Sequence, residues 1–225
     1  MKLYSYWRSS SAWRVRIALA WKGIDCEIIP VHLVRDGGEQ HLPAFLARNP
    51  LAQVPVLEVE QSEGRQAVLL TQSVAILEYL EEVHPTPALL PTDPLARART
   101  RRLVEIINSG MQPYQNLRLQ QTLRSHGIEP IPVTREFIAT GLNALERYAR
   151  DEAGAFLVGD ALTFADIMLV PQLHAARRLG VELQDGSAPH FPTLARVEAA
   201  CAALPAFRQA HADAQPDAEK GPSSP

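Results

Sequence analysis

The amino-acid sequence predicts an α/β domain followed by an all-α domain. Three observations lead to this fold class. Residues 1–33 carry a strand pattern, a helix pattern and a second strand pattern. Two proline-rich segments, 84–87 and 90–94, then interrupt the chain. Beyond them, every periodic segment has the spacing of apolar residues that is typical of helices.

The prolyl breaks set the predicted domain boundaries, because boundaries commonly fall in proline-rich and polar connections. We expect the first domain at residues 1–84, a linker at 85–94 and the second domain at 95–212. The segment 213–225 is polar and contains three prolines, so we predict a disordered tail there.

The first domain is predicted in the order βαβ-α-ββ-α. Met1–Tyr6 is a short aromatic-rich run, and Gly23 is a suitable C-cap for the helix before it. Pro55 belongs at a strand start because proline cannot donate a ladder hydrogen bond. The expected strands are 1–6, 25–33, 54–59 and 67–70, with a turn at 62–65, and the expected helices are 12–21, 42–48 and 72–83.

The second domain is predicted to be entirely helical. Thr163-Phe164-Ala165-Asp166 fits a capping box with Asp in place of the usual Glu, which would start one of these helices. The expected helices are 95–124, 130–151, 164–179, 192–203 and 205–210.

Composition excludes several classes of protein. The net charge is −3 and the pI is about 6.2, with no strongly basic segment, so we expect no nucleic-acid partner. No stretch approaches the ~20 apolar residues that span a bilayer, and the N-terminal apolar run is too short for a signal peptide. Cys26 and Cys201 have no metal or redox spacing, and no histidine pair has metal spacing. We expect no metal and a cytoplasmic location.

The serine run at residues 9–11 is the first candidate site. A single serine in this place would serve as an N-cap, since its hydroxyl accepts a backbone N–H. Three consecutive serines also bring hydroxyls and amides to the positive end of a helix dipole, where a bound thiol is pushed toward thiolate. The residues alone leave both interpretations open.

Two further segments have the same ambiguity. Gln72-Ser73 opens a predicted helix, so Ser73 is either a cap or part of a carboxylate site. Val54-Pro55 leaves its isomer open, because few X-Pro bonds are cis. A cis bond would turn the backbone of Val54 outward, where a peptide ligand could pair with it as an added strand.

Together these residues carry a resemblance to a known family. Ser9 to Leu19, read as S-S-S-A-W-R-V-R-I-A-L, resembles the zeta-class glutathione transferase signature S-S-C-x-W-R-V-R-I-A-L. The match continues in order from residue 1 to about 210, through Asp36-Gly37-Gly38, Asn49 to Pro55, Gln72-Ser73, Glu78 to Glu82, Pro85-Thr86-Pro87, Gln112 to Leu117, Val158-Gly159-Asp160, Ala165-Asp166 and Leu169 to Gln172.

The resemblance implies a fold, an activity and a partner. It implies a thioredoxin-like first domain, a helical second domain, a homodimer and bound glutathione. The implied reaction is the glutathione-dependent cis–trans isomerisation of maleylacetoacetate to fumarylacetoacetate in tyrosine and phenylalanine breakdown.

The resemblance also assigns roles to individual residues. Ser9 would support the glutathione thiolate, and Ser10 and Ser11 would line the same helix start. Arg178 would bind a substrate carboxylate, and Arg8, beside the serine run, is a second candidate for that task. The remaining glutathione-binding positions are Gln40, Val54 (through its backbone, before a cis-Pro55), Gln72, Ser73, Gln112 and Asn116.

One departure from the family pattern keeps alternatives open. Ser11 stands where the family usually has cysteine, which argues against thiol–disulfide exchange but not against isomerisation, since glutathione brings its own thiol. The alternatives are a maleylpyruvate isomerase and a general transferase that conjugates electrophiles. A non-catalytic binding protein is disfavoured because the serine run, Val54-Pro55 and Gln72-Ser73 are all intact.

Overall fold

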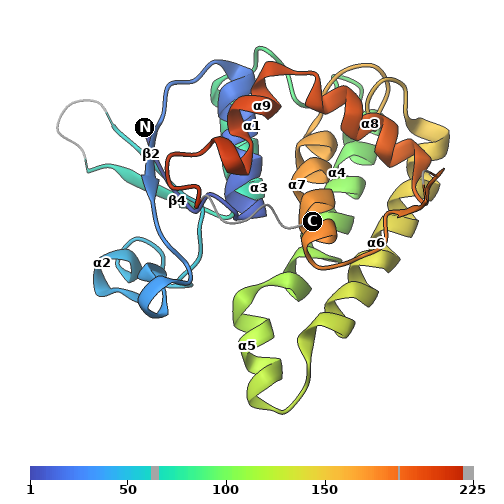
Figure 1. Ribbon diagram of the computed structural model, residues 1–225. Helices are drawn as coiled ribbons and strands as arrows, with labels where there is room; N and C mark the ends of the chain where they lie inside the picture. The colour runs from blue at the N-terminus through green and yellow to red at the C-terminus, as the bar shows by residue number, and fades with distance from the viewer. Residues whose placement is uncertain (62–65, 187, 220–225) are drawn as a thin grey trace. The chain divides into compact units, whose positions relative to one another are not determined.

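The chain folds into two compact units (Figure 1). The computed structural model describes residues 1–61, 66–186 and 188–219. The first unit joins Met1–Pro87 with the chain from Leu204 onward, and the second is Ala88–Ala203. Within the described residues, no helix is both long enough and apolar enough to span a bilayer.

The first unit contains a four-stranded mixed sheet in the order β2-β1-β3-β4. Leu3 of the central strand β1 lies opposite Ile28 of the parallel β2 and Leu57 of the antiparallel β3. Leu3 and Leu57 are fully buried. The predicted βαβ-α-ββ-α order is confirmed, while the predicted turn at 62–65 lies outside the described residues. The strands are β1 (Lys2–Ser5), β2 (Glu27–Pro30), β3 (Val56–Val59) and β4 (Val68–Thr71).

Helix α1 (Ser10–Lys22) forms the core of this unit and packs against α3 (Ser73–Val83) and α9 (Pro205–Ala210). Gly23 ends α1 with φ 64°, a left-handed conformation that favours glycine, so the predicted C-cap is confirmed. The loop after β2 contains three short helical segments, which are η1 (Arg35–Gly37), η2 (Glu39–His41) and α2 (Pro43–Leu46).

The C-terminal segment differs from the prediction. Helix α9 groups with the first unit, although the sequence placed it in the helical domain. Beyond it, η4 (Ala212–Ala214) forms, and Asp217 accepts a hydrogen bond from the Trp7 amide at 2.9 Å. The polar composition predicts disorder from residue 213. The prediction fails because composition does not reveal a hydrogen-bond partner that lies 210 residues away in the sequence. Residues 220–225 lie outside the described part of the chain.

The second unit is helical, apart from two short strands that were too brief to be predicted. The prediction of a single helix over 95–124 is wrong, because this range forms three separate elements, α4, η3 and α5. Gly110 and Pro113 lie at the break, and both residues disfavour a helix interior. The elements are α4 (Pro94–Asn108), η3 (Gln112–Gln115), α5 (Leu117–Ser125), α6 (Pro130–Glu152), α7 (Phe164–Arg178), β5 (Gln184–Asp185), β6 (Ala188–Pro189) and α8 (Pro192–Ala202).

Helix α7 is the centre of the second unit and packs against α4 and α8. Its predicted capping box is confirmed, with the Asp166 carboxylate accepting from the amide and the hydroxyl of Thr163 at 2.8 and 2.9 Å. Complete burial raises the pKa of Asp166 to about 6, against the opposing effect of these hydrogen bonds. The box fixes the start of the helix whose last residue is Arg178.

Candidate functional site

The start of α1 carries the serine run. Ser9 is the N-cap, and its Oγ accepts from the Ala12 amide at 3.2 Å. A hydroxyl that accepts through a lone pair still has its own hydrogen to donate. Ser10 and Ser11 form the first turn, and this turn contains no acidic residue. The two interpretations of the run are therefore compatible, since Ser9 can cap the helix and still face an anion.

The loop before Ser9 is held by Arg16, whose role was not predicted. The buried Arg16 guanidinium donates to the carbonyls of Tyr6 and Trp7 at 3.3 and 2.9 Å, and to Ser5 Oγ at 2.9 Å. Burial lowers the pKa of Arg16 to about 10, so it is still a cation at neutral pH. Arg8, the candidate for a substrate carboxylate, lies half-buried over the Trp7 ring at 5.3 Å.

The start of α3 carries Gln72 and Ser73. The helix begins at Ser73, and its N-cap Gln72 forms no side-chain cap and has φ 69°. A positive φ in a residue other than glycine is unfavourable and is found preferentially at functional sites. Ser73 is buried, and its Oγ accepts from Nη1 of the fully buried Arg14 at 3.3 Å. This bond joins the helix of the serine run to Ser73, a connection that was not predicted.

Val54 lies beside a cis peptide bond to Pro55. The turn before it is held by the buried Asn49, whose Nδ2 donates to the Gln53 carbonyl at 2.7 Å and whose Oδ1 accepts from the Leu51 amide at 3.1 Å. The Val54-Pro55 bond is therefore the cis isomer that the family resemblance implied, whereas the dipeptide alone left the isomer open.

Gln40 presents an acceptor that lacks a donor. Its Nε2 donates to the Leu33 carbonyl at 3.2 Å, whereas its buried Oε1 accepts no hydrogen bond from any described residue. Buried polar atoms are nearly always paired, so an orphaned carbonyl is suited to a ligand N–H. Gly38 lies against this amide with φ 96°, and a Cβ there would come within 2.4 Å of Gln40 Nε2.

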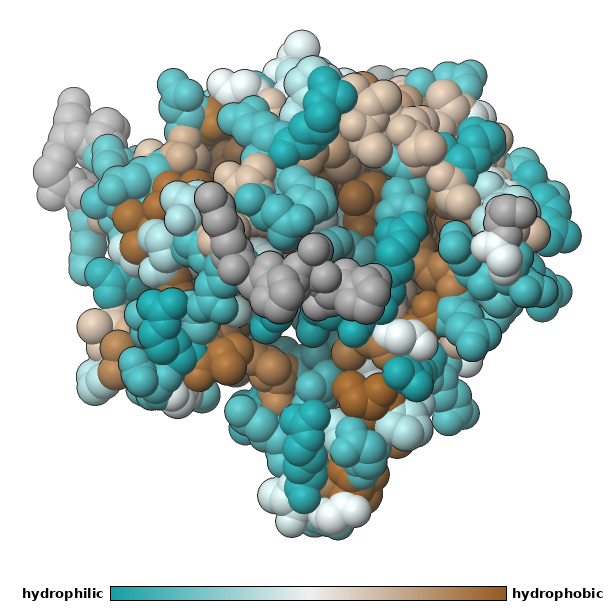
Figure 2. All heavy atoms as spheres, viewed as in Figure 1, coloured by the Kyte–Doolittle hydropathy of each residue, from teal (hydrophilic) through white to brown (hydrophobic). Residues whose placement is uncertain are grey.

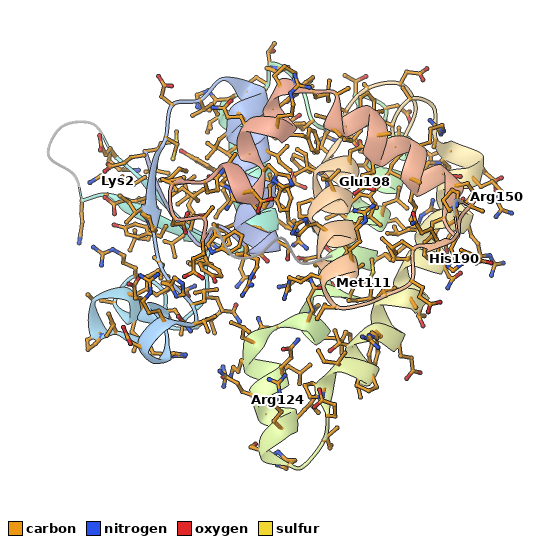
Figure 3. All side chains as sticks on the ribbon, viewed as in Figure 1. Lys2, Met111, Arg124, Arg150, His190 and Glu198 are labelled. Carbon is orange, nitrogen blue, oxygen red and sulfur yellow. The ribbon has the colours of Figure 1, made fainter. Side chains whose placement is uncertain are left out.

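Gln112 and Asn116 lie at the two ends of η3 in the second unit. Gln112 is the first residue of η3, and Asn116 follows it and caps α5 by accepting from the Arg118 amide at 2.9 Å. The segment is anchored by a buried amide pair, since Gln115 and Gln172 exchange hydrogen bonds at 3.1 and 3.2 Å. Met111, labelled in Figure 3, precedes η3 and packs where Gly141 of α6 has no side chain.

Arg178 is the last residue of α7 and is exposed. It lies six residues, or about 9 Å of helix, beyond Gln172. The adjacent Arg177 is bound to Glu198 of α8, labelled in Figure 3, with Nη1 to Oε1 at 2.6 Å. The hydrogen bond with Glu198 raises the pKa of Arg177. The candidate residues thus form two groups, with Ser9, Gln40, Val54 and Ser73 in one unit and Gln112, Asn116 and Arg178 in the other.

Comparison with known proteins identifies the family. Residues 1–82 match the model of the glutathione S-transferase N-terminal domain, and residues 135–215 that of the C-terminal domain. Maleylacetoacetate isomerase of Rattus norvegicus is 45% identical, over 96% of this chain and 94% of its own. The chain belongs to the maleylacetoacetate isomerase family of zeta-class glutathione transferases. Another family member, from Pseudomonas aeruginosa, is 46% identical over 96% of this chain and 98% of its own.

Solved structures of this family agree with the fold. Maleylacetoacetate isomerase of Anaeromyxobacter dehalogenans with glutathione bound in its active site has a TM-score of 0.87 and 55% identity, over 97% of both chains. The same enzyme has also been solved with dicarboxyethyl glutathione and citrate in the active site. A zeta-class maleyl pyruvate isomerase has a TM-score of 0.87 and 40% identity, over 97% of this chain and 100% of its own.

Proposed function

We propose that this chain is a glutathione-dependent isomerase that converts maleylacetoacetate to fumarylacetoacetate in tyrosine and phenylalanine breakdown. The start of α1 carries the proposal, because it combines the Ser9 hydroxyl with a helix end that has no acidic residue of its own. Identities of 45 and 46% with two maleylacetoacetate isomerases support the choice of substrate.

Each part of glutathione has a proposed partner. Gln40 Oε1, buried and without a donor among the described residues, accepts an N–H of the tripeptide. The backbone of Val54 pairs with the ligand as an added strand. Gln72, Ser73 and the first amides of α3 bind the carboxylate of the γ-glutamyl end. Ser9, Ser10 and Ser11 surround the sulfur, and Gln112 and Asn116 are the proposed glutathione-binding positions of the second unit.

The chemistry divides between the ligand and the chain. Bound glutathione supplies a thiolate that adds reversibly to the activated C=C bond of the substrate, so that rotation becomes possible. Ser9 donates its hydroxyl hydrogen to the sulfur, and the positive end of α1 favours the anion by about 0.3–1 kcal/mol. Arg178 and Arg8 bind the carboxylates of the diacid, since a guanidinium group can hold a carboxylate through two parallel hydrogen bonds.

Product analysis with and without glutathione tests the proposal. The purified chain should form fumarylacetoacetate from maleylacetoacetate only when glutathione is present. Conjugation of a model chloroarene or of dichloroacetate, measured in parallel, tests for a general transferase. Faster conjugation than isomerisation would replace the proposal, and failure to bind glutathione by calorimetry would favour a binding protein without this chemistry.

Maleylpyruvate is the second candidate substrate. The observation in its favour is the likeness to a maleyl pyruvate isomerase, with 40% identity over 97% of this chain. Measuring kcat/KM for both diacids on the same preparation decides between them, and we expect the higher value for maleylacetoacetate.

We also propose that the chain forms a homodimer in the cytoplasm. Figure 2 shows hydrophobic residues at the surface around α2, where Leu42, Leu46 and Leu51 are 55%, 38% and 48% exposed. Exposed apolar groups of this kind often mark an interface. Light scattering on the purified chain should give twice the chain mass, and Leu51→Asp should reduce it. Cell fractionation tests the compartment. The free thiols of Cys26 and Cys201 are compatible with a reducing cytoplasm.

A further inference from the structure

The C-terminal segment, residues 211–219, has contacts that the proposed function does not use. In Figure 1 it is the red chain that follows α9. Ala212 is fully buried, and the buried Gln215 amide donates to the carbonyls of Gln209 and His211 at 3.1 and 2.9 Å. The ring of His211 packs edge-on against Trp13 of α1, with 4.9 Å between centroids. These contacts give the segment a defined conformation on the first unit.

Asp217 holds the loop that leads into Ser9. Its carboxylate accepts from the Trp7 amide at 2.9 Å, two residues before the helix cap. Arg16 binds the carbonyl of the same Trp7 at 2.9 Å, and the charge of Asp217 opposes the lowering of the Arg16 pKa by burial. An acidic and a basic side chain therefore bind the backbone N–H and C=O of one residue, Trp7, and the acid comes from the C-terminal segment.

Glu219 reaches the loop that carries Gln40. Its Oε1 lies 2.9 Å from His32 Nε2 and accepts from Arg35 Nη2 at 3.1 Å. His32 Nδ1 accepts from the amides of Val34 and Arg35 at 3.2 and 2.7 Å, so the hydrogen of the neutral ring is on Nε2, facing Glu219. The His32 carbonyl accepts from the Glu39 amide at 2.8 Å, which connects this contact to the residue before Gln40.

We infer that residues 211–219 position two loops for glutathione, with Asp217 and Glu219 as positioning residues. The loops are residues 6–9 (the Ser9 loop) and residues 31–42 (the Gln40 loop). The inference rests on the proposed function for the identity of the ligand. The two acids reach two loops that are far apart in sequence and that each carry a proposed ligand group. Losing either acid should change glutathione binding without removing a group that touches the ligand.

Point variants of the full chain test this role. Asp217→Ala removes the carboxylate, Asp217→Asn keeps an acceptor but no charge, and Glu219→Gln tests the second loop. Asp213→Ala is the matched control, since its exposed carboxylate contacts only His211 of its own segment, at 3.6 Å, among the described residues. The readouts are the glutathione Kd by calorimetry, the pKa of the bound thiol by thiolate absorbance, and amide exchange at Trp7 by NMR.

We expect Asp217→Ala to weaken glutathione binding by about three- to tenfold and to raise the pKa of the bound thiol. This is less than the full value of one charge-assisted hydrogen bond, because Asp217 acts on the ligand only through the loop. Asp217→Asn should lie between this variant and the wild type, and Asp213→Ala should match the wild type. In a Ser9→Ala background, the effect of Asp217→Ala on the thiol pKa should largely vanish, because it acts through the Ser9 loop.

Equal effects of Asp217→Ala with and without Ser9, or equal effects of Asp217→Ala and Asp213→Ala, would overturn the inference. Absence of glutathione binding by the wild type would instead defeat the proposed function. The Trp7 amide still reports on the segment in that case, because its exchange should be faster in Asp217→Ala than in Asp213→Ala. Unchanged exchange would overturn the positioning role by itself.

Discussion

Ser9 combines two functions in one hydroxyl group. Its oxygen accepts the Ala12 amide and so caps α1, while its hydrogen is available to a bound anion. Both functions need the same placement, because the anion site of a helix is the end that the cap defines. At the residue scale, stability and chemistry are therefore coupled at Ser9, and variants must separate them.

Ser9→Ala should lower isomerase turnover by about tenfold or more, because hydrogen bonds to charged groups contribute about 1.5–3 kcal/mol. Loss of the cap should also cost about 1 kcal/mol of unfolding free energy. Ser9→Thr keeps a capping hydroxyl and is the control. Turnover is measured with saturating glutathione, and stability by urea unfolding. Near-normal turnover in Ser9→Ala would remove Ser9 from the mechanism.

Ser11→Cys should create a reactive thiol, since a helix N-terminus lowers a thiol pKa from its usual value of about 8.5. The two native cysteines are internal controls. Burial raises the pKa of the Cys26 thiol to about 11 and also raises that of the Cys201 thiol. Iodoacetamide labelling near neutral pH, mapped by mass spectrometry, should favour position 11 by about tenfold or more. Glutathione should protect position 11 from labelling. An equal extent of labelling with and without glutathione would place residue 11 outside the site.

At the element scale, hydrogen bonds between distant segments bring the candidate groups to their positions. Arg14 connects α1 with Ser73, and Gln115 connects η3 with α7 through Gln172. The periodicity of the sequence located α1, α3 and α7, since their apolar positions repeat. Periodicity could not locate these connections, because it relates residues only within one helix or strand, whereas the partners of the two bonds lie 59 and 57 residues apart. It also missed the η3 break, where the apolar spacing continues across Gly110.

The Gln115–Gln172 pair should stabilise the second unit only as a pair. Gln172→Leu leaves the buried amide of Gln115 without this partner and should cost about 1–3 kcal/mol of unfolding free energy. Replacing both residues by Leu should recover part of that loss, because the Gln115 amide that loses Gln172 is then removed as well. Equilibrium urea unfolding of the two single variants and the double variant measures the difference. Additive losses in the double variant would show that the two amides act independently.

At the scale of the whole molecule, the chain builds its first unit from both ends of the sequence, with α9 and residues 211–219 beside the sheet domain. The fold class followed from the sequence, because each periodic pattern is local and the domain order is linear. The return of the C-terminus did not, since Asp217 and Glu219 look like ordinary solvated acids in a polar tail. The resemblance located the candidate residues Ser9 and Arg178, but not the roles of Arg16 and Asp217, which bind the backbone of the loop before Ser9.

The proposed function assigns a carboxylate of the diacid to Arg178, and substitutions at Arg178 test that assignment. Arg178→Ala should raise KM for the diacid by about tenfold or more, as expected for a lost guanidinium–carboxylate pair, and leave the glutathione Kd unchanged. Arg177→Ala is the matched control, because Arg177 is already bound to Glu198 on the neighbouring helix. It removes the same charge one residue away and should leave both constants near the wild-type values. Steady-state kinetics with each ligand varied in turn, together with glutathione calorimetry, separates the effects. An unchanged KM for the diacid in Arg178→Ala, or an equal rise in Arg177→Ala, would assign the carboxylate to another residue, with Arg8 the next to test.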